Sequence, residues 1–139
     1  MRTGFGLVLL LALAPALASA KPLPRYGAFV YSSLCWEKQS GDASGVRFAL
    51  SRGRKGARLD YEYGNGPLQG ARIKSLKLTG DRMEAEASTS DGDLGLAADL
   101  GARTAKLSIL FAYQKDGPPD VRVLKRIRRF KQPIPACRR

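Results

Sequence analysis

Residues 58–63 alternate strictly between polar and apolar side chains, in the order Arg58-Leu59-Asp60-Tyr61-Glu62-Tyr63. Successive side chains of a β-strand point to opposite faces of a sheet, so a repeat of two residues is typical of a strand with one buried and one solvated face. An amphipathic helix would instead need apolar residues at every third or fourth position. The stretch therefore predicts a strand whose apolar side chains face inward.

The same alternation recurs through the rest of the chain. Apolar residues separated by one position occur at Val46, Phe48 and Leu50, at Met83, Ala85 and Ala87, and at Leu107, Ile109 and Phe111. Further apolar segments lie around residues 28–36, 71–78, 93–100 and 121–128, which gives about eight strands. Between Ile73 and Leu76 the apolar phase changes, and one extra residue near Lys74-Ser75, a β-bulge, explains that shift. No stretch has a convincing helical period.

Residues typical of turns separate these segments, because Gly, Asp, Asn and Pro adopt or pre-set the backbone angles of tight turns. They occur at Ser40-Gly41-Asp42, Arg52-Gly53-Arg54, Gly64-Asn65-Gly66-Pro67, Gly80-Asp81, Asp91-Gly92-Asp93 and Asp116-Gly117-Pro118-Pro119. Consecutive strands joined by short turns predict an all-β fold, a single antiparallel meander. We expect it to close into a barrel of lipocalin-like shape rather than to form a two-sheet sandwich. Closure would place the first and last strands side by side.

The expected barrel is similar in outline to lipocalin-like barrels and to the small periplasmic lysozyme-inhibitor barrels. The sequence motifs of both families differ from this chain. Trp36 follows Leu34-Cys35, where lipocalin-like chains usually carry Gly-x-Trp, and Ser40-Gly41 lacks the tyrosine of the inhibitors' Ser-Gly-x-x-Tyr loop. The likeness is one of shape, and shape alone implies no function.

The N-terminus carries the features of an export signal. Arg2 provides a positive charge, residues 7–14 are an unbroken apolar run, and Ala18-Ser19-Ala20 is a small-x-small cleavage site. The apolar run is shorter than the roughly 20 residues that a membrane-spanning helix needs. We therefore expect residues 1–20 to be a cleaved signal peptide and residues 21–139 to form a single β-barrel-like domain with a basic C-terminal segment. The mature protein would be periplasmic or secreted, and not transmembrane.

The chain has only two cysteines, Cys35 and Cys137, so only one intramolecular pairing exists. Disulfides persist in the oxidising compartments that exported proteins reach. The two residues lack C-x-x-C spacing, and the chain has no histidine to complete a zinc site. The sequence predicts a structural disulfide that ties the C-terminal segment to the first strand.

The amino-acid composition does not favour a catalytic function. The 139 residues include no histidine, which removes the commonest general base and metal ligand. The carboxylate pairs Asp60/Glu62 and Glu84/Glu86 alternate with apolar residues, so we expect both pairs on the solvated face of the sheet. We predict that the protein is not an enzyme and has no catalytic, cofactor-binding or metal-binding residues.

The chain is strongly basic, with 24 Lys and Arg against 12 Asp and Glu and a formal net charge of +12. If residues 121–128 form a strand with alternating faces, Val121, Val123 and Ile127 would face inward and a row of arginines would face outward. The candidate anion-binding residues are Arg52, Arg54, Lys55, Arg122, Arg126 and Arg128. A basic surface attracts polyanions through its field. The expected partner is lipopolysaccharide, an anionic lipid, an anionic wall polymer or a protein, and export disfavours nucleic acid. The alternative is a solvated surface that keeps the protein soluble.

Large and small residues lie on neighbouring strands of the expected interior. Phe48, Tyr61, Tyr63 and Phe111 are the candidate lining of a ligand cavity, opposite small residues such as Ala85. Small-against-large packing of a dry core is the alternative.

Three functions are compatible with these features. The leading hypothesis is binding of an anionic envelope component or protein through the basic surface. The second is carriage of a small apolar ligand inside the barrel. The third is inhibition of an exported hydrolase through exposed loops such as residues 64–70. The oligomeric state is left open.

Overall fold

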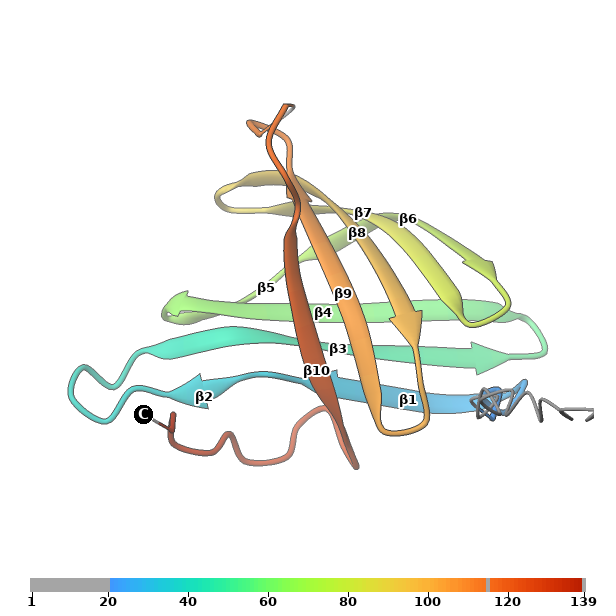
Figure 1. Cartoon of the computed structure of the whole chain (residues 1–139), viewed down its shortest axis with the longest axis horizontal. Helices are drawn as coiled ribbons and strands as arrows, with labels where there is room; N and C mark the ends of the chain where they lie inside the picture. The colour runs from blue at the N-terminus through green and yellow to red at the C-terminus, as the bar shows by residue number, and fades with distance from the viewer. Residues whose placement is uncertain (1–20, 115, 139) are drawn as a thin grey trace, which may run out of the picture.

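The computed structural model describes residues 21–114 and 116–138, which form ten β-strands and no helix (Figure 1). The strands are β1 (Gly27–Ser32), β2 (Cys35–Trp36), β3 (Ala43–Gly53), β4 (Gly56–Gly66), β5 (Leu68–Gly70), β6 (Arg72–Thr79), β7 (Arg82–Thr89), β8 (Gly92–Leu100), β9 (Thr104–Phe111) and β10 (Asp120–Ile127). The predicted signal peptide, residues 1–20, lies outside the described residues. The described part of the chain contains no helix with the length and hydropathy needed to cross a membrane.

The strands follow one another around a nearly closed antiparallel barrel. Their order in the sheet is β5-β4-β3-β1-β10-β9-β8-β7-β6, and the short β2 pairs with β3 beside this path. β1 and β10 are neighbours, with Val30 opposite Ile127. The predicted all-β barrel is confirmed, and so is the predicted contact between the first and last long strands.

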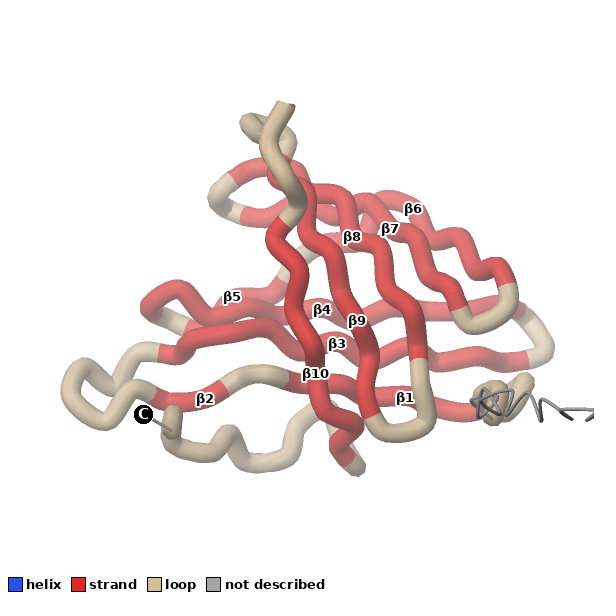
Figure 2. The backbone as a smooth tube through the Cα atoms, in the orientation of Figure 1, coloured by secondary structure: helices blue, strands red, loops and turns tan. Residues whose placement is uncertain are grey.

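The barrel wall is interrupted between β4 and β6 (Figure 2). β5 pairs with the end of β4, and just beyond it the Ala71 N–H donates a hydrogen bond of 3.0 Å to the Tyr61 carbonyl oxygen. Among the described residues, β6 then pairs only with β7, and its register shifts between Ile73 and Ser75. This shift is the predicted bulge, and a bulge bends a strand and blunts its free edge.

The core consists of the inward-facing side chains of most strands, as the alternation predicted. Leu59 and Tyr61 of β4 are 4 % exposed, and Phe48 and Leu50 of β3 are fully buried. The largest fully buried side chains are Tyr31, Phe48, Leu50, Met83, Leu107, Ile109 and Leu124. Burying apolar surface of this kind is the dominant favourable contribution to folding.

The phase of β10 is opposite to the predicted one. Val121 and Val123 are 47 % and 66 % exposed, whereas Leu124 is fully buried and Arg122 and Arg126 are half-buried. Both phases of this strand contain apolar residues, so alternation alone does not decide between them. The pairing with β1 and β9 does, because a shift of one residue exchanges the two faces. The long arginine side chains can share the inner face because their charged ends reach the ends of the barrel.

The C-terminal segment, residues 128–137, lies along the outside of the barrel and is joined to the β2 region by the predicted Cys35–Cys137 disulfide. The Trp36 N–H donates to the Pro135 carbonyl oxygen at 2.8 Å, and the Cys137 N–H donates to the Trp36 carbonyl oxygen at 2.9 Å. Glu62 was expected on a solvated face. It does point outward, but it is only 6 % exposed because this segment covers it.

Candidate functional site

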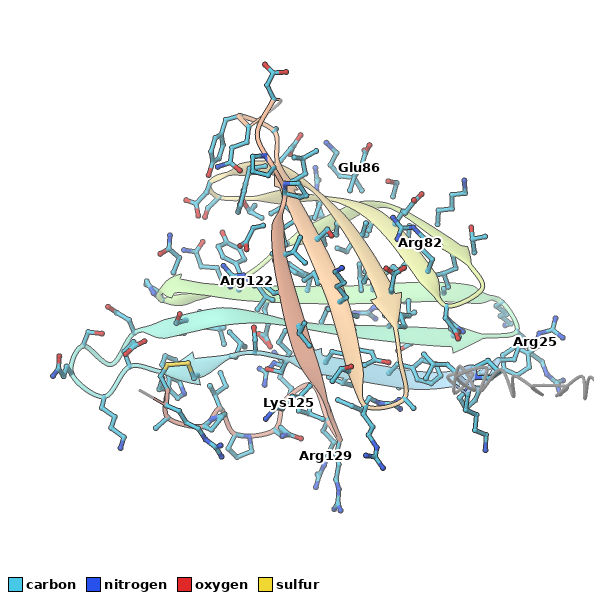
Figure 3. All side chains as sticks on the ribbon, viewed as in Figure 1. Arg25, Arg82, Glu86, Arg122, Lys125 and Arg129 are labelled. Carbon is cyan, nitrogen blue, oxygen red and sulfur yellow. A yellow bond between two sulfur atoms is a disulfide. The ribbon has the colours of Figure 1, made fainter. Side chains whose placement is uncertain are left out.

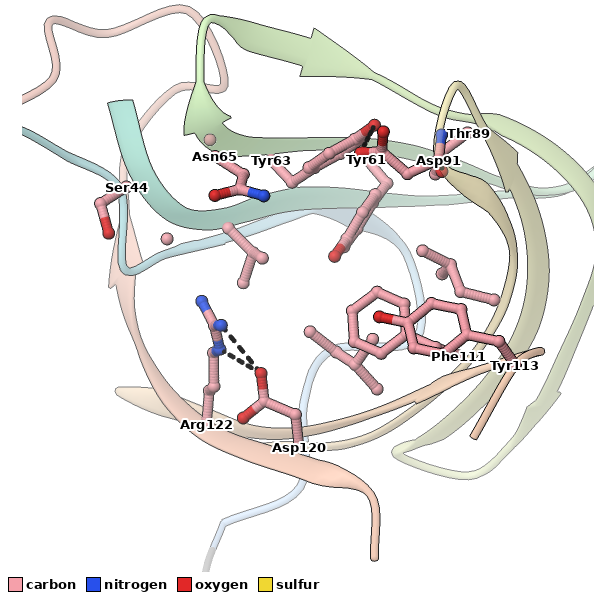
Figure 4. A pocket seen from close by; sticks show the side chains of 15 residues that line it. Ser44, Tyr61, Tyr63, Asn65, Thr89, Asp91, Phe111, Tyr113, Asp120 and Arg122 are labelled. Carbon is pink, nitrogen blue, oxygen red and sulfur yellow. Dashed lines mark hydrogen bonds and ion pairs between the residues drawn. The ribbon is translucent and has the colours of Figure 1, made fainter. Parts of the chain in front are cut away.

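A cavity of about 520 Å³ opens at one end of the barrel (Figure 4). Its lining comes from β3, β4, β7, β8, β9, β10 and the residues next to them. The lining residues are Ser44, Gly45, Val46, Tyr61, Tyr63, Gly64, Asn65, Thr89, Asp91, Leu94, Ile109, Phe111, Tyr113, Asp120 and Arg122. The cavity is therefore a mouth in the barrel interior, with buried apolar residues at its floor and polar residues at its rim.

Two paired glycines allow close backbone contacts beside the mouth. Gly45 of β3 lies directly opposite Gly64 of β4, two positions from the Arg47–Glu62 pair and therefore on the same outer face of the sheet. A Cβ atom at Gly64 would lie 2.5 Å from the Ala43 backbone, and a Cβ at Gly45 would lie 2.5 Å from the Ser33 carbonyl oxygen. Both distances are too short for a side chain, and Gly45 also has a φ of +100° that favours glycine.

The candidate cavity residues fall into two groups. Tyr61, Tyr63 and Phe111 line the mouth, as predicted. Phe48 does not, because it is fully buried in the filled half of the barrel, with its ring centroid 5.3 Å from that of Tyr31. The barrel interior therefore contains both of the expected alternatives. One half of it is a packed core, and the other half is a cavity.

Two aromatic pairs form walls of the mouth. The ring centroids of Tyr61 and Tyr63 on β4 are 6.3 Å apart, with an angle of 27° between the ring planes. Those of Phe111 and Tyr113, at the end of β9, are 5.4 Å apart with an angle of 23°. Each pair presents roughly parallel ring faces, a geometry that suits stacking with another flat apolar group.

Polar groups at the rim are mostly paired with one another. The Nε atom of Arg122 is 2.9 Å from the Oδ2 atom of Asp120, and its Nη2 atom is 2.8 Å from the same oxygen. The Tyr63 hydroxyl lies 3.1 Å from the Gln69 Oε1 atom and 3.3 Å from the Asp91 Oδ2 atom. These contacts hold the side chains in place at the edge of the cavity.

The Tyr61 hydroxyl is the exception. The side chain is 96 % buried, and its oxygen points into the cavity on the side where the Arg122 guanidinium also lies (Figure 4). No hydrogen-bond partner for this oxygen is found among the described residues. Burial raises the pKa of Tyr61, and the nearby Arg122 charge lowers it only in part, so the hydroxyl stays protonated and can donate a hydrogen bond.

The predicted outward row of Arg122, Arg126 and Arg128 does not form. Arg122 lines the mouth. At the other end of the barrel, the guanidinium carbons of Arg126 and Arg52 lie 4.9 Å and 5.4 Å from the ring centroid of Phe29. Arg52 also has Nη1 at 3.4 Å from the Asp81 Oδ1 atom. The predicted row is therefore wrong, because the inward phase of β10 turns two of its members toward the interior.

The remaining candidate residues are exposed. Arg54 and Lys55 lie in the turn between β3 and β4, and Arg128 follows the end of β10. Lys125 and Arg129 project from the same end of β10, whereas Arg122 lies toward the other end of that strand (Figure 3). These exposed charges still make parts of the surface basic.

One group of possible metal ligands occurs among the described residues, formed by Cys35, Glu37 and Cys137. The two sulfur atoms are joined to each other in the disulfide, so they do not offer free thiolates to a metal.

Comparison of the chain with models of protein families, with curated proteins and with solved structures finds no match. Of the residues that line the mouth, Tyr61, Tyr63 and Phe111 were candidate cavity residues, whereas the others, including Asp120, Arg122 and Tyr113, were not predicted as such. Only Leu124, at an even position of β10, signalled that Asp120 and Arg122 share the inward face.

Proposed function

We propose that this protein is a non-enzymatic binding protein that holds a small, largely apolar ligand in the mouth of its barrel. The observation that carries the proposal is the cavity of about 520 Å³ with aromatic walls, beside a half of the barrel that side chains fill. Small-molecule sites typically measure about 300–1,000 Å³ and combine apolar walls with a few fixed polar groups. Residues of the rim supply such groups.

We expect binding without catalysis. The chain has no histidine. The described lining offers hydroxyl groups, two carboxylates and one guanidinium. Asp120 is paired with Arg122, and Asp91 lies 3.3 Å from the Tyr63 hydroxyl, which Gln69 also contacts. Catalysis by a hydroxyl nucleophile needs an adjacent general base, and histidine is the commonest one.

We further propose that the protein acts outside the cytoplasm. The disulfide is compatible with a periplasmic or extracellular location, since such bonds persist in oxidising compartments. The signal-like residues 1–20 support the same location.

Two other functions remain predictions. The exposed Arg54, Lys55 and Arg128 support binding of an anionic envelope component. The continuous row of arginines on which this hypothesis was based is absent from the described surface. Inhibition of a hydrolase through residues 64–70 has no feature of this structure in its favour. The ligand-binding proposal rests on a formed cavity and is preferred.

Filling the mouth tests the proposal. Asn65 is exposed, and its side chain points toward the cavity (Figure 4), so Asn65→Trp should occupy ligand space without disturbing the core. With the neutral fluorescent probe N-phenylnaphthylamine, we expect one probe bound per wild-type chain and about tenfold weaker binding to Asn65→Trp, equivalent to roughly 1.4 kcal/mol. Fluorescence titration measures both.

Lys106→Trp is the matched control, because it places a tryptophan on an exposed position of β9 outside the cavity. It should bind the probe as the wild type does, and thermal unfolding should show that both variants are folded. Equal binding by wild type and Asn65→Trp, or no binding by the wild type, would contradict the proposed function.

A further inference from the structure

We propose that the ligand is a planar, uncharged molecule that presents a hydrogen-bond acceptor to the Tyr61 hydroxyl and the Arg122 guanidinium. This inference rests on the proposed function and specifies the class of ligand. Three properties of the mouth lead to it: a donor that faces the cavity without a partner among the described residues, the balance of charge among the described lining residues, and the arrangement of the aromatic rings.

The first property is the Tyr61 hydroxyl. A ligand that fills the mouth would cover this hydroxyl, and a polar group covered without a hydrogen bond is costly, so the ligand must supply a partner for it. The Tyr61 side chain is 4 % exposed, has no partner among the described residues and points into the cavity. Burial keeps this hydroxyl protonated, so it offers a proton to whatever occupies the mouth. The matching group on a ligand is an acceptor such as a carbonyl oxygen.

The second property is the charge of the lining. Among the lining residues that the structure describes, Arg122 is the only cation, and Asp120 and Asp91 are both carboxylates, so these residues together carry one negative charge in excess. Because Asp120 already contacts the Arg122 guanidinium through Nε and Nη2, an anionic ligand would compete with it and also face Asp91. A carboxylate group on a ligand would therefore add little binding energy in the mouth. The remaining N–H groups of Arg122 can still donate to a neutral oxygen.

A cationic ligand fits less well for a different reason. An ammonium group would be attracted by the two carboxylates and the ring faces. It would, however, give no acceptor to Tyr61, and it would stand close to the Arg122 charge. The polar group that satisfies both donors without a charge conflict is a neutral acceptor.

The third property concerns shape. The Tyr61–Tyr63 and Phe111–Tyr113 pairs each present two rings within 27° and 23° of parallel. A flat ring system can stack on such ring faces with offset geometry. A flexible acyl chain cannot stack, and only the burial of its apolar surface would favour its binding. The mouth thus favours an aromatic ligand with its oxygen directed toward Tyr61.

Four naphthalene probes of matched size separate these possibilities. They carry an acetyl, an ethyl, a carboxylate or an aminomethyl group at the same ring position, and their affinities for the full, disulfide-bonded chain are measured by displacement of N-phenylnaphthylamine. We expect acetylnaphthalene to bind most tightly. Its advantage over ethylnaphthalene should be about two- to tenfold, which is the range that one hydrogen bond gives.

Tyr61→Phe removes the hydroxyl and keeps the ring, so it should reduce the advantage of the acetyl probe to the part that Arg122 supplies and leave the affinity of the ethyl probe unchanged. Tyr26→Phe is the matched control, since Tyr26 is exposed and lies outside the cavity lining, and it should preserve the advantage.

Each other result overturns the inference. Tightest binding of the carboxylate or the aminomethyl probe would show that the mouth selects a charged ligand. An acetyl advantage of the same size in Tyr61→Phe as in the wild type would show that Tyr61 is not a donor to the ligand. In both cases the proposed function would stand. If none of the four probes displaced N-phenylnaphthylamine and that probe itself did not bind, the proposed function would fail as well.

Discussion

Loss of the Cys35–Cys137 disulfide is expected to lower the free energy of unfolding by about 4–5 kcal/mol. The bond joins residues 102 positions apart, so it restricts nearly the whole unfolded chain. In the chain-entropy description of disulfides, the stabilisation grows with the logarithm of loop length, and a loop of roughly 100 residues lies near the upper end of the scale. Because typical domains are stable by only about 5–15 kcal/mol, this loss is a large share of the total.

Denaturant unfolding of the double variant Cys35→Ala/Cys137→Ala measures the effect against the oxidised wild type. The wild type treated with a reducing agent should lose the same amount, which separates the loss of the bond from the change of side chain. The β1–β10 pairing and the Trp36–Pro135 hydrogen bond do not involve the sulfur atoms and should survive. A loss below about 1 kcal/mol would contradict this account, because the bond would then add little to a fold that is already closed.

Glu62→Gln is expected to destabilise the protein by about 3–5 kcal/mol, because it leaves the Arg47 charge buried without its counter-ion. Arg47 and Glu62 are 3 % and 6 % exposed on the outer side of β3 and β4. The Arg47 Nε and Nη2 atoms both donate to the Glu62 Oε1 atom. Arg47 also donates to the Gln132 carbonyl oxygen at 3.1 Å and stacks 5.0 Å from the Phe130 ring centroid, so the pair anchors the C-terminal segment.

Asp60→Asn is the matched control for this prediction. Its carboxylate pairs with Arg58, whose side chain is 78 % exposed, and exposed pairs of this kind contribute little. Equilibrium unfolding should therefore show Asp60→Asn close to the wild type. The double variant Arg47→Met/Glu62→Leu should recover much of the loss, since a buried ion pair can be replaced by apolar residues of similar size. Equal stability of Glu62→Gln and Asp60→Asn would show that the Arg47–Glu62 pair does not anchor the segment.

The features of the fold that could be predicted from the sequence are local ones. Alternation over residues 58–63 and its counterparts predicted the long strands, glycines and aspartates predicted the turns, and the shift near Lys74-Ser75 predicted the bulge. The disulfide followed from the count of cysteines. Each of these depends on a residue and its near neighbours in the chain.

The features that could not be predicted depend on contacts between distant segments. Val123 and Leu124 are both apolar, so only the register with β1 and β9 decides which of them is buried. Glu62 alternates like a solvated residue, and it is buried because a segment nearly 70 positions later covers it. Phe48 and Tyr61 have similar patterns, but one fills the core and the other lines the mouth. The two residues are direct partners in the pairing of β3 with β4, so the difference comes from the side chains around each of them, such as Tyr31 beside Phe48.

Methyl NMR spectra recorded with and without N-phenylnaphthylamine test most directly whether the mouth of the barrel holds a ligand. Val46, Leu94 and Ile109 line the mouth, whereas Leu50 and Leu124 belong to the filled half. We predict shifts of the first three sets of methyl signals upon addition of the probe, with those of Leu50 and Leu124 unchanged. Shifts confined to the exposed Leu110, Val121 and Val123 on the outer face would contradict the claim, because the probe would then bind the outside of the sheet and leave the mouth empty.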